Sequence, residues 1–239
     1  MNRELIGQIQ KDKDVEYIFC DFYDTIVHRN VHPYHTFKLW AKHLKRELGL
    51  PSSSYDLFKI RRASMKFLSQ KTGLFESELS YIDVIKEVRN RLECANLIHP
   101  DHHVLENFAI FFKEADFFAE ISVQYLNPQM IDTLKQLKEI GYKLYCVSDF
   151  HFDTDIMERL LEHHGIANIY DGVFVSAAYN ASKEHKGILY KKILEELQIN
   201  GGQAYMIGDN LRSDVEYAQL YHIKAYYLKR RYVKINQKL

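Results

Sequence analysis

The alternation of short apolar runs with helical patterns constrains the fold of this chain more than any other feature of its sequence. Five short runs, each bounded by turn or charged residues, predict buried strands: Tyr17–Cys20, Lys143–Val147, Gly172–Ser176, Ala204–Ile207 and Lys224–Tyr227. Amphipathic helical patterns lie between the later runs; Gly141 ends one of them and Gly201 follows another. Because helices of this length serve as crossovers between parallel strands, we expect an α/β protein with a three-layer parallel sheet.

The stretch between the first two predicted strands differs from the rest because it contains helical patterns and no convincing strand. Apolar residues recur there at helical spacing in three stripes, which include Trp40, Val84 and Phe108. We therefore expect a helical insertion large enough to form a small lobe. The predicted division is an α/β core of residues 1–30 and 127–239 and a helical lobe of residues 31–126.

The charge balance and the cysteines exclude several classes of protein. The 32 basic and 32 acidic side chains give a formal net charge of zero, which argues against a protein whose main partner is a nucleic acid. No apolar stretch approaches the roughly 20 residues that span a bilayer, so we expect no membrane partner. The three cysteines form no CxxC pair, which favours a reducing cytoplasmic compartment. The sequence does not indicate an oligomeric state.

Polar residues follow the first four predicted strands directly or at a short distance. In an open parallel sheet, ligands bind beyond the carboxyl ends of the strands, so these residues are the candidates for a functional site. They are Asp21, Tyr23, Asp24 and Thr25 after the first strand, Ser148 after the second, Lys183 and Lys186 after the third, and Asp209, Asn210 and Asp214 after the fourth.

These residue types suit the chemistry of a phosphate ester. Asp21 and Asp209 offer the hard oxygen ligands that Mg²⁺ prefers, and a carboxylate can also attack phosphorus. Two carboxylates would repel a phosphate dianion, so a metal ion and a lysine are needed to balance the charge. The Ser148 hydroxyl can donate a hydrogen bond to a phosphoryl oxygen.

The order Asp-x-x-Asp-Thr, Ser, Lys, Gly-Asp-x-x-x-x-Asp resembles the haloacid dehalogenase-like (HAD) hydrolase superfamily. The segments Asp-Phe-Tyr-Asp-Thr-Ile-Val-His-Arg, from Asp21, and Ser-Asp-Phe-His-Phe, from Ser148, are similar to motifs of a bacterial branch written Asp-x-Phe-Asp-Thr-Leu-x-x-Arg and Ser-Asp-Met-Tyr. The resemblance covers roughly residues 15–30 and 127–228. It implies a Rossmann-like parallel sheet core with a helical cap inserted between the first and second motifs.

The resemblance also implies a role for each residue. Asp21 takes the place of the nucleophile, and Asp21, Asp209 and the backbone carbonyl of Tyr23 take the places of the Mg²⁺ ligands. Ser148 takes the place of the phosphate-binding hydroxyl. Either Lys183 or Lys186 matches the lysine of the third motif. The supporting residues are Asp24, Thr25, Asn210 and Asp214, of which Asp214 would orient the lysine or the water shell of the metal.

Tyr23 is the one departure from the phosphatase pattern. Phosphatases of the superfamily carry an aspartate acid/base two residues after the nucleophile, whereas a phenol with a reference pKa near ~10 is a poor base at neutral pH. Dehalogenases of the superfamily carry an aromatic residue there, and Asp24 would replace the missing acid only if the loop turned it inward.

We therefore expect an Mg²⁺-dependent phosphomonoesterase that acts on a small phosphorylated metabolite through an aspartyl-phosphate at Asp21. Two alternatives stay open. One is a catalytically impaired protein that binds a phosphorylated ligand or a partner, which Tyr23 favours. The other is a metal-independent hydrolase of the dehalogenase type, which shares the aspartate nucleophile.

Overall fold

The computed structural model describes residues 1–98 and 102–229, and only the backbone of residues 102–106. A five-stranded sheet of order β5-β4-β1-β6-β7 forms its centre, and all neighbouring strands are parallel. Each predicted strand is present, within one residue of the expected bounds. The strands are β1 (Tyr17–Cys20), β4 (Lys143–Ser148), β5 (Gly172–Val175), β6 (Ala204–Gly208) and β7 (Lys224–Tyr227).

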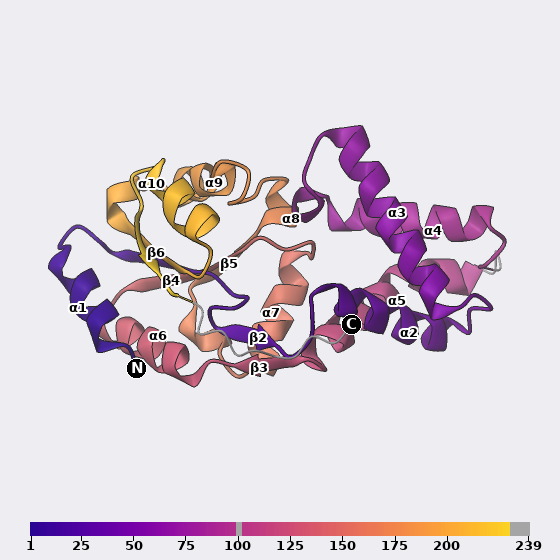
Figure 1. Cartoon of the computed structure of the whole chain (residues 1–239), viewed down its shortest axis with the longest axis horizontal. Helices are drawn as coiled ribbons and strands as arrows, with labels where there is room; N and C mark the ends of the chain where they lie inside the picture. Colours follow the sequence, from indigo (N-terminus) through magenta and orange to yellow (C-terminus); the bar gives the residue numbers. More distant parts are fainter. Residues whose placement is uncertain (99–101, 230–239) are drawn as a thin grey trace.

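Helices cover both faces of this sheet, as Figure 1 shows. Successive side chains of β1 point to opposite faces: Ile18 and Cys20 belong to the apolar cluster that includes α1, α6 and α7, whereas Phe19 packs with α9 and α10. This confirms the α/β three-layer prediction. The helices of the two layers are α1 (Arg3–Lys11), α6 (Pro128–Ile140), α7 (Thr154–His163), α9 (Ile188–Leu197) and α10 (Tyr217–Gln219).

Short helical turns lie at both ends of the sheet. At the carboxyl end, the four-residue helix α8 continues directly from β5, and a π-helical turn, η4, follows β6. At the amino end, η2 precedes β5 and η3 precedes β6. These elements are α8 (Ser176–Tyr179), the 3₁₀ turns η2 (Ala167–Ile169) and η3 (Gly201–Gln203), and η4 (Leu211–Glu216).

Four helices between β2 and β3 lie to one side of the sheet (Figure 1). Local signals delimit them: the Ser53 side chain accepts a hydrogen bond from the N–H of Asp56, and left-handed Gly49 and Gly73 end two helices. Among the described residues, no helix combines the length and hydropathy that a membrane span requires. The elements are α2 (Tyr34–Leu48), α3 (Ser54–Thr72), the 3₁₀ turn η1 (Glu76–Glu78), α4 (Tyr81–Cys94) and α5 (His102–Ile121).

A two-stranded antiparallel ribbon joins these helices to the sheet. It pairs β2 (Val27–Arg29) with β3 (Gln124–Leu126). The expectation that residues 31–126 contain no strand is therefore wrong for β3. Three residues are too few to produce a periodic pattern, and the ribbon forms because the chain leaves and re-enters the sheet region side by side. The boundaries between a core and a cap at residues 30/31 and 126/127 stay a prediction.

Candidate active site

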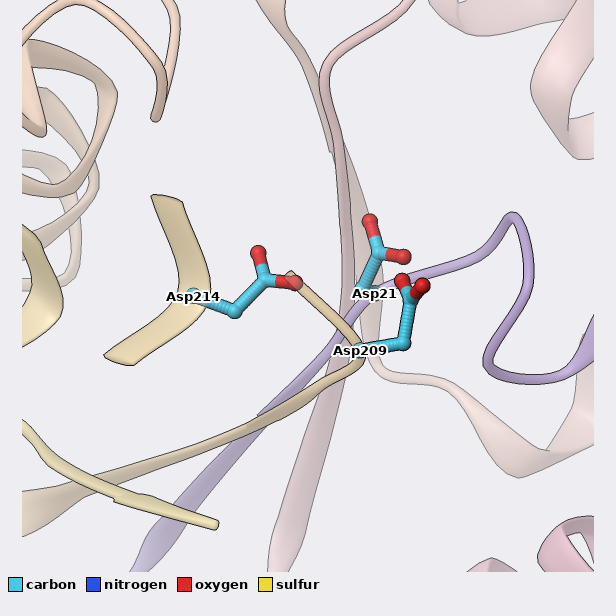
Figure 2. Close-up of side chains that lie close together, drawn as sticks. All are labelled: Asp21, Asp209 and Asp214. Carbon is cyan, nitrogen blue, oxygen red and sulfur yellow. The ribbon is translucent and has the colours of Figure 1, made fainter. Parts of the chain in front are cut away.

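Three carboxylates meet at the carboxyl edge of the sheet. Asp21 follows β1, Asp209 follows β6 and Asp214 lies in η4; all three are buried, and one oxygen of each lies within 4.8 Å of the others. Figure 2 shows the three side chains gathered at the strand ends. The register explains why the first two lie close together: Cys20 pairs with Ile207, so Asp21 is level with Gly208, and Asp209 follows one residue later on the neighbouring strand.

One lysine completes this group. Lys183 Nζ donates hydrogen bonds to Asp21 Oδ1 and Asp214 Oδ1, both at 2.7 Å, and the residue is 2% exposed. Lys186 is exposed, and its backbone carbonyl accepts a hydrogen bond from the Tyr221 hydroxyl. Of the two lysines considered from the sequence, the structure brings only Lys183 to the carboxylates. We call Asp21, Asp209, Asp214 and Lys183 the aspartate cluster.

The aspartate cluster is electrostatically unbalanced. Burial raises the pKa of Asp21 to about 8 although Lys183 lowers it, and Asp214 and Asp209 raise it further. Burial lowers the pKa of Lys183, but the two carboxylates outweigh burial and raise it well above its usual range. When ionised, three carboxylates face one ammonium and leave two negative charges. The donor set of buried carboxylate oxygens fits a hard divalent cation such as Mg²⁺, whose charge would balance the cluster.

Gly208 makes room for Asp214. A Cβ atom on residue 208 would lie 2.2 Å from Asp214 Oδ2, so only glycine is accommodated there. The same carboxylate oxygen accepts a hydrogen bond from the backbone N–H of Asn210 at 3.0 Å. The Asn210 side chain points to the turn that follows, where it accepts hydrogen bonds from the N–H groups of Arg212 and Ser213. Asn210 thus caps η4 and does not reach the carboxylates through its side chain.

Thr25 and Ser148 also lie at the strand ends. The buried Thr25 hydroxyl donates to Asp21 Oδ2 at 3.3 Å, which places it beside the predicted nucleophile. Ser148 is the last residue of β4, the strand next to β1, and is 1% exposed. The structure therefore brings both residues to the edge that carries Asp21.

Asp149 is a residue that we did not predict to act at the site. Its two carboxylate oxygens accept hydrogen bonds from the backbone N–H groups of Lys183 at 2.8 Å and Glu184 at 2.9 Å. Burial raises the pKa of Asp149 to about 6. Asp149 thus holds the segment that carries Lys183. The sequence signals for it were its position directly after Ser148 and its place in the Ser-Asp-Phe-His-Phe segment.

The hydroxyl of Tyr23 does not point toward the carboxylates of the aspartate cluster. Its ring packs against Phe150 at 4.5 Å between centroids and lies beneath the Arg29 guanidinium, whose Cζ is 3.5 Å from the ring centroid. The hydroxyl donates to Glu120 Oε2 at 3.2 Å. Burial, and then Glu120, raise the pKa of the phenol well above its usual range. The Tyr23 side chain is therefore hydrogen-bonded to a residue at the C-terminal end of α5.

Arg29 and Glu120 form a buried ion pair that the sequence did not reveal. Arg29 Nε donates to Glu120 Oε2 at 2.9 Å, and their side chains are 9% and 0% exposed. The two residues are 91 positions apart and meet because β2 pairs with β3. We call Tyr23, Arg29 and Glu120 the tyrosine cluster.

Asp24 occupies an outward position in the same loop. Its backbone is left-handed, with φ of 60°, and its side chain is 42% exposed and lies 3.7 Å from Nδ1 of His28. The inward turn that would let Asp24 replace the missing acid is therefore not present.

One family of hydrolases matches most of the chain, including the elements that carry these residues. A family model described as haloacid dehalogenase-like hydrolase matches residues 15–220, which include both β1 and η4. The chain belongs to the haloacid dehalogenase-like hydrolases. A search of curated proteins found no match. The matched range confirms the resemblance predicted from the order of the strand-end motifs.

Solved structures of HAD-like enzymes share this fold at low sequence identity. A 2-haloacid dehalogenase from Pseudomonas syringae is 16% identical, with a TM-score of 0.64 over 89% of this chain and 86% of that chain. A HAD-hydrolase from Bacillus subtilis, solved bound to magnesium, is 17% identical, with a TM-score of 0.55 over 89% and 88%. A HAD phosphatase from Thermococcus onnurineus is 20% identical, with a TM-score of 0.52 over 91% and 87%. These similarities establish the fold, and they include both dehalogenases and phosphatases.

Proposed function

We propose that this HAD-like hydrolase is an Mg²⁺-dependent phosphomonoesterase that acts on a small phosphorylated metabolite. The observation that carries the proposal is the charge imbalance of the aspartate cluster. Hydrolysis of a carbon–halogen bond by an aspartate needs no metal, so it gives no reason to bury two further carboxylates beside the nucleophile. A phosphomonoester brings more negative charge, which makes a divalent cation necessary.

In the proposed reaction, Asp21 attacks phosphorus through one carboxylate oxygen. A phosphorus–oxygen bond to the carboxylate forms, and the bond to the ester oxygen breaks with its electron pair on the departing alkoxide or phenolate, which then takes a proton from water. Water then hydrolyses the aspartyl-phosphate and returns Asp21 and inorganic phosphate. Lys183 and the Ser148 hydroxyl would donate hydrogen bonds to the phosphoryl oxygens, and Thr25 would orient the Asp21 carboxylate.

Asp21, Asp209 and the backbone carbonyl of Tyr23 would hold Mg²⁺. When bound, the ion supplies positive charge to the phosphoryl oxygens and offsets the repulsion between the carboxylates. Asp214 would keep Lys183 charged and aligned, since it accepts from Nζ at 2.7 Å. The two negative charges left by the cluster match the charge of one such ion.

A second candidate function is dehalogenation, and Tyr23 is the observation that favours it. An aromatic side chain stands where a phosphatase would have its acid/base carboxylate, and Asp24 does not replace it. Dehalogenation transfers no proton to its halide leaving group, so it does not need that acid.

One experiment separates the candidates. Purified protein is assayed against a panel of phosphomonoesters and 2-haloacids, with Mg²⁺ and with a chelator. We expect phosphate release that requires Mg²⁺. Halide release that survives the chelator would instead support the dehalogenase. Tight binding of one phosphate ester without turnover of any compound would support the impaired, ligand-binding alternative.

A further inference from the structure

A buried glutamate of the helical insertion contacts the segment that carries Lys183. Glu78, in η1, is 0% exposed. Its Oε1 accepts hydrogen bonds from the backbone N–H of Ser182 at 2.9 Å and from the Ser182 hydroxyl at 2.8 Å. Its Oε2 accepts from the N–H of Phe75 at 2.8 Å. The turn η1 therefore reaches from the insertion to the residue directly before Lys183.

Backbone contacts of η1 strengthen this connection. The Glu78 carbonyl accepts a hydrogen bond from Asn180 Nδ2 at 2.8 Å, and the Ser77 carbonyl accepts one from the Ser176 hydroxyl. The partners all belong to the stretch between the end of β5 and Lys183. The insertion thus contacts this stretch at three successive points, at residues 176, 180 and 182.

Lys183 is consequently held from two sides. Glu78 binds Ser182, while Asp149, after β4, accepts from the N–H groups of Lys183 and Glu184. The backbone of residues 182–184 determines the position of the Lys183 Cα atom. It therefore determines whether Nζ lies between Asp21 and Asp214. Asp149 follows a strand of the sheet, whereas Glu78 belongs to the insertion.

A carboxylate in this place is unfavourable for the fold by itself. Burial of a carboxylate costs free energy unless hydrogen bonds or a cation compensate it, and a buried charge is weak evidence for stabilisation. Among the described residues, the ion-pair partner of Glu78 is His185, whose Nδ1 is 3.2 Å from Oε1 and whose side chain is 40% exposed. If η1 moved away from the sheet, Glu78 would exchange its bonds with Ser182 for water. Docking of η1 therefore depends on the same hydrogen bonds that fix Ser182.

We propose that Glu78 is a positioning residue that aligns Lys183 with the nucleophile when the insertion is docked on the sheet. Docking then completes the site, because the lysine reaches its place between the carboxylates only in the docked arrangement. This inference rests on the proposed function for its catalytic consequence, but the docking itself can be measured without any turnover.

The first test measures docking in the ligand-free protein. Cys94 on α4 is exposed, whereas Cys20 and Cys146 are buried, so a spin label on Cys94 and a second on Lys191→Cys of α9 report the distance between insertion and sheet. We expect one narrow distance distribution for the otherwise native chain. Glu78→Ala should add a population at longer distances. An unchanged distribution in Glu78→Ala would overturn the docking role, whatever the protein hydrolyses.

The second test measures turnover of p-nitrophenyl phosphate with Mg²⁺. Glu78→Ala should lower kcat by about 10- to 100-fold, because small misplacements of a catalytic group have effects of this size. KM should change less than kcat. Glu76→Gln is the matched control, since Glu76 lies in the same turn, pairs with Arg62 and is partly exposed; it should leave kcat unchanged.

Three further variants keep the test decisive. Glu78→Gln retains an acceptor oxygen for Ser182 and should restore most of kcat. Ser182→Ala removes the bond that the hydroxyl donates to Glu78 and the bond that it accepts from the N–H of His185, but keeps the bond from the Ser182 N–H to Glu78. It should lower kcat by only about fivefold, which gives a result even if Glu78→Ala does not fold. In a Lys183→Ala background, Glu78→Ala should have no additional effect on the residual kcat. An equal loss with and without Lys183, or no rescue by glutamine, would overturn the positioning role.

Discussion

The aspartate cluster and the tyrosine cluster each contain one end of the short segment Asp21–Tyr23, and they differ in whether their buried charges cancel. The first buries three carboxylates around the single ammonium of Lys183. The second buries one carboxylate, Glu120, in contact with one guanidinium, Arg29, and the neutral phenol of Tyr23 contacts both. Asp21 and Tyr23 are only two residues apart.

This difference separates a group of buried residues with a net charge from one whose charges cancel. An unbalanced group of buried charges destabilises the folded chain until a counterion binds, so its presence indicates function. The ion pair of Arg29 and Glu120 at the ribbon of β2 and β3 has no net charge and holds the insertion to the sheet. Four predictions test this contrast.

The largest effect is expected at the nucleophile. Asp21→Asn keeps the shape of the side chain but removes the charge needed for attack, so turnover of a phosphomonoester should fall by about three orders of magnitude or more. Asp132→Asn, an exposed substitution on α6, is the control and should not change turnover. Steady-state kinetics of purified variants measure the effect, and near-normal turnover of Asp21→Asn would exclude Asp21 as the nucleophile.

The next effect concerns the acid that Tyr23 does not supply. General acid catalysis contributes typically ~100- to 10,000-fold. Alkyl phosphates, whose alkoxide leaving groups need a proton, should be slower by about this factor than aryl or acyl phosphates of similar size. Comparison of kcat/KM across such pairs provides the measurement. Equal rates would mean that a group other than Tyr23 or Asp24 donates the proton.

Substitution of one member of the balanced pair should mainly affect stability. Arg29→Met leaves the Glu120 carboxylate buried without its partner, which should lower the free energy of unfolding by about 3–5 kcal/mol. The double variant Arg29→Met/Glu120→Gln should recover much of this loss, as measured by urea unfolding. A single variant as stable as the native chain would show that the pair does not hold the ribbon.

Per unit of pH, the smallest effect is the pH dependence of the metal-free protein. Folding raises the pKa of Asp21 from its ordinary value of 3.8 to about 8, chiefly through burial, so between these values the folded state binds a proton that the unfolded state has lost. Stability should therefore fall as pH rises through this window, by at most about 1.4 kcal/mol per pH unit for this group. Urea unfolding at pH 5, 6.5 and 8 measures the slope.

Asp21→Asn should remove this part of the slope, and Mg²⁺ should raise the melting temperature more at pH 8 than at pH 5. A slope that is unchanged in Asp21→Asn would assign the dependence to other groups, such as Asp149, whose pKa is raised to about 6. No effect of Mg²⁺ at any pH would contradict the charge argument for the aspartate cluster.

The sequence by itself determined the sheet and most of the strand-end residues. A buried parallel strand must be a short apolar run, and the residue after it must lie at the carboxyl edge of the sheet, so both follow from local order along the chain. This is why the five strands, Asp21, Ser148 and Asp209 could be located without a structure. The three-residue strand β3 was too short for its pattern to be recognised.

Only the tertiary structure decided which side chains meet. By its distance from Ser176, Lys183 matches the third motif best, but Lys186 fits a second form of that motif, so the sequence left the choice open. Asp21 binds a lysine 162 positions away, and which lysine it binds depends on the conformation of the loop after β5. The hydrogen bond between Tyr23 and Glu120 joins residues 97 positions apart in the sequence. The hydrogen bond between Ser182 and Glu78 joins residues 104 positions apart. Such contacts depend on how the insertion packs on the sheet, because a hydrogen bond requires distances that no periodicity in one segment can encode.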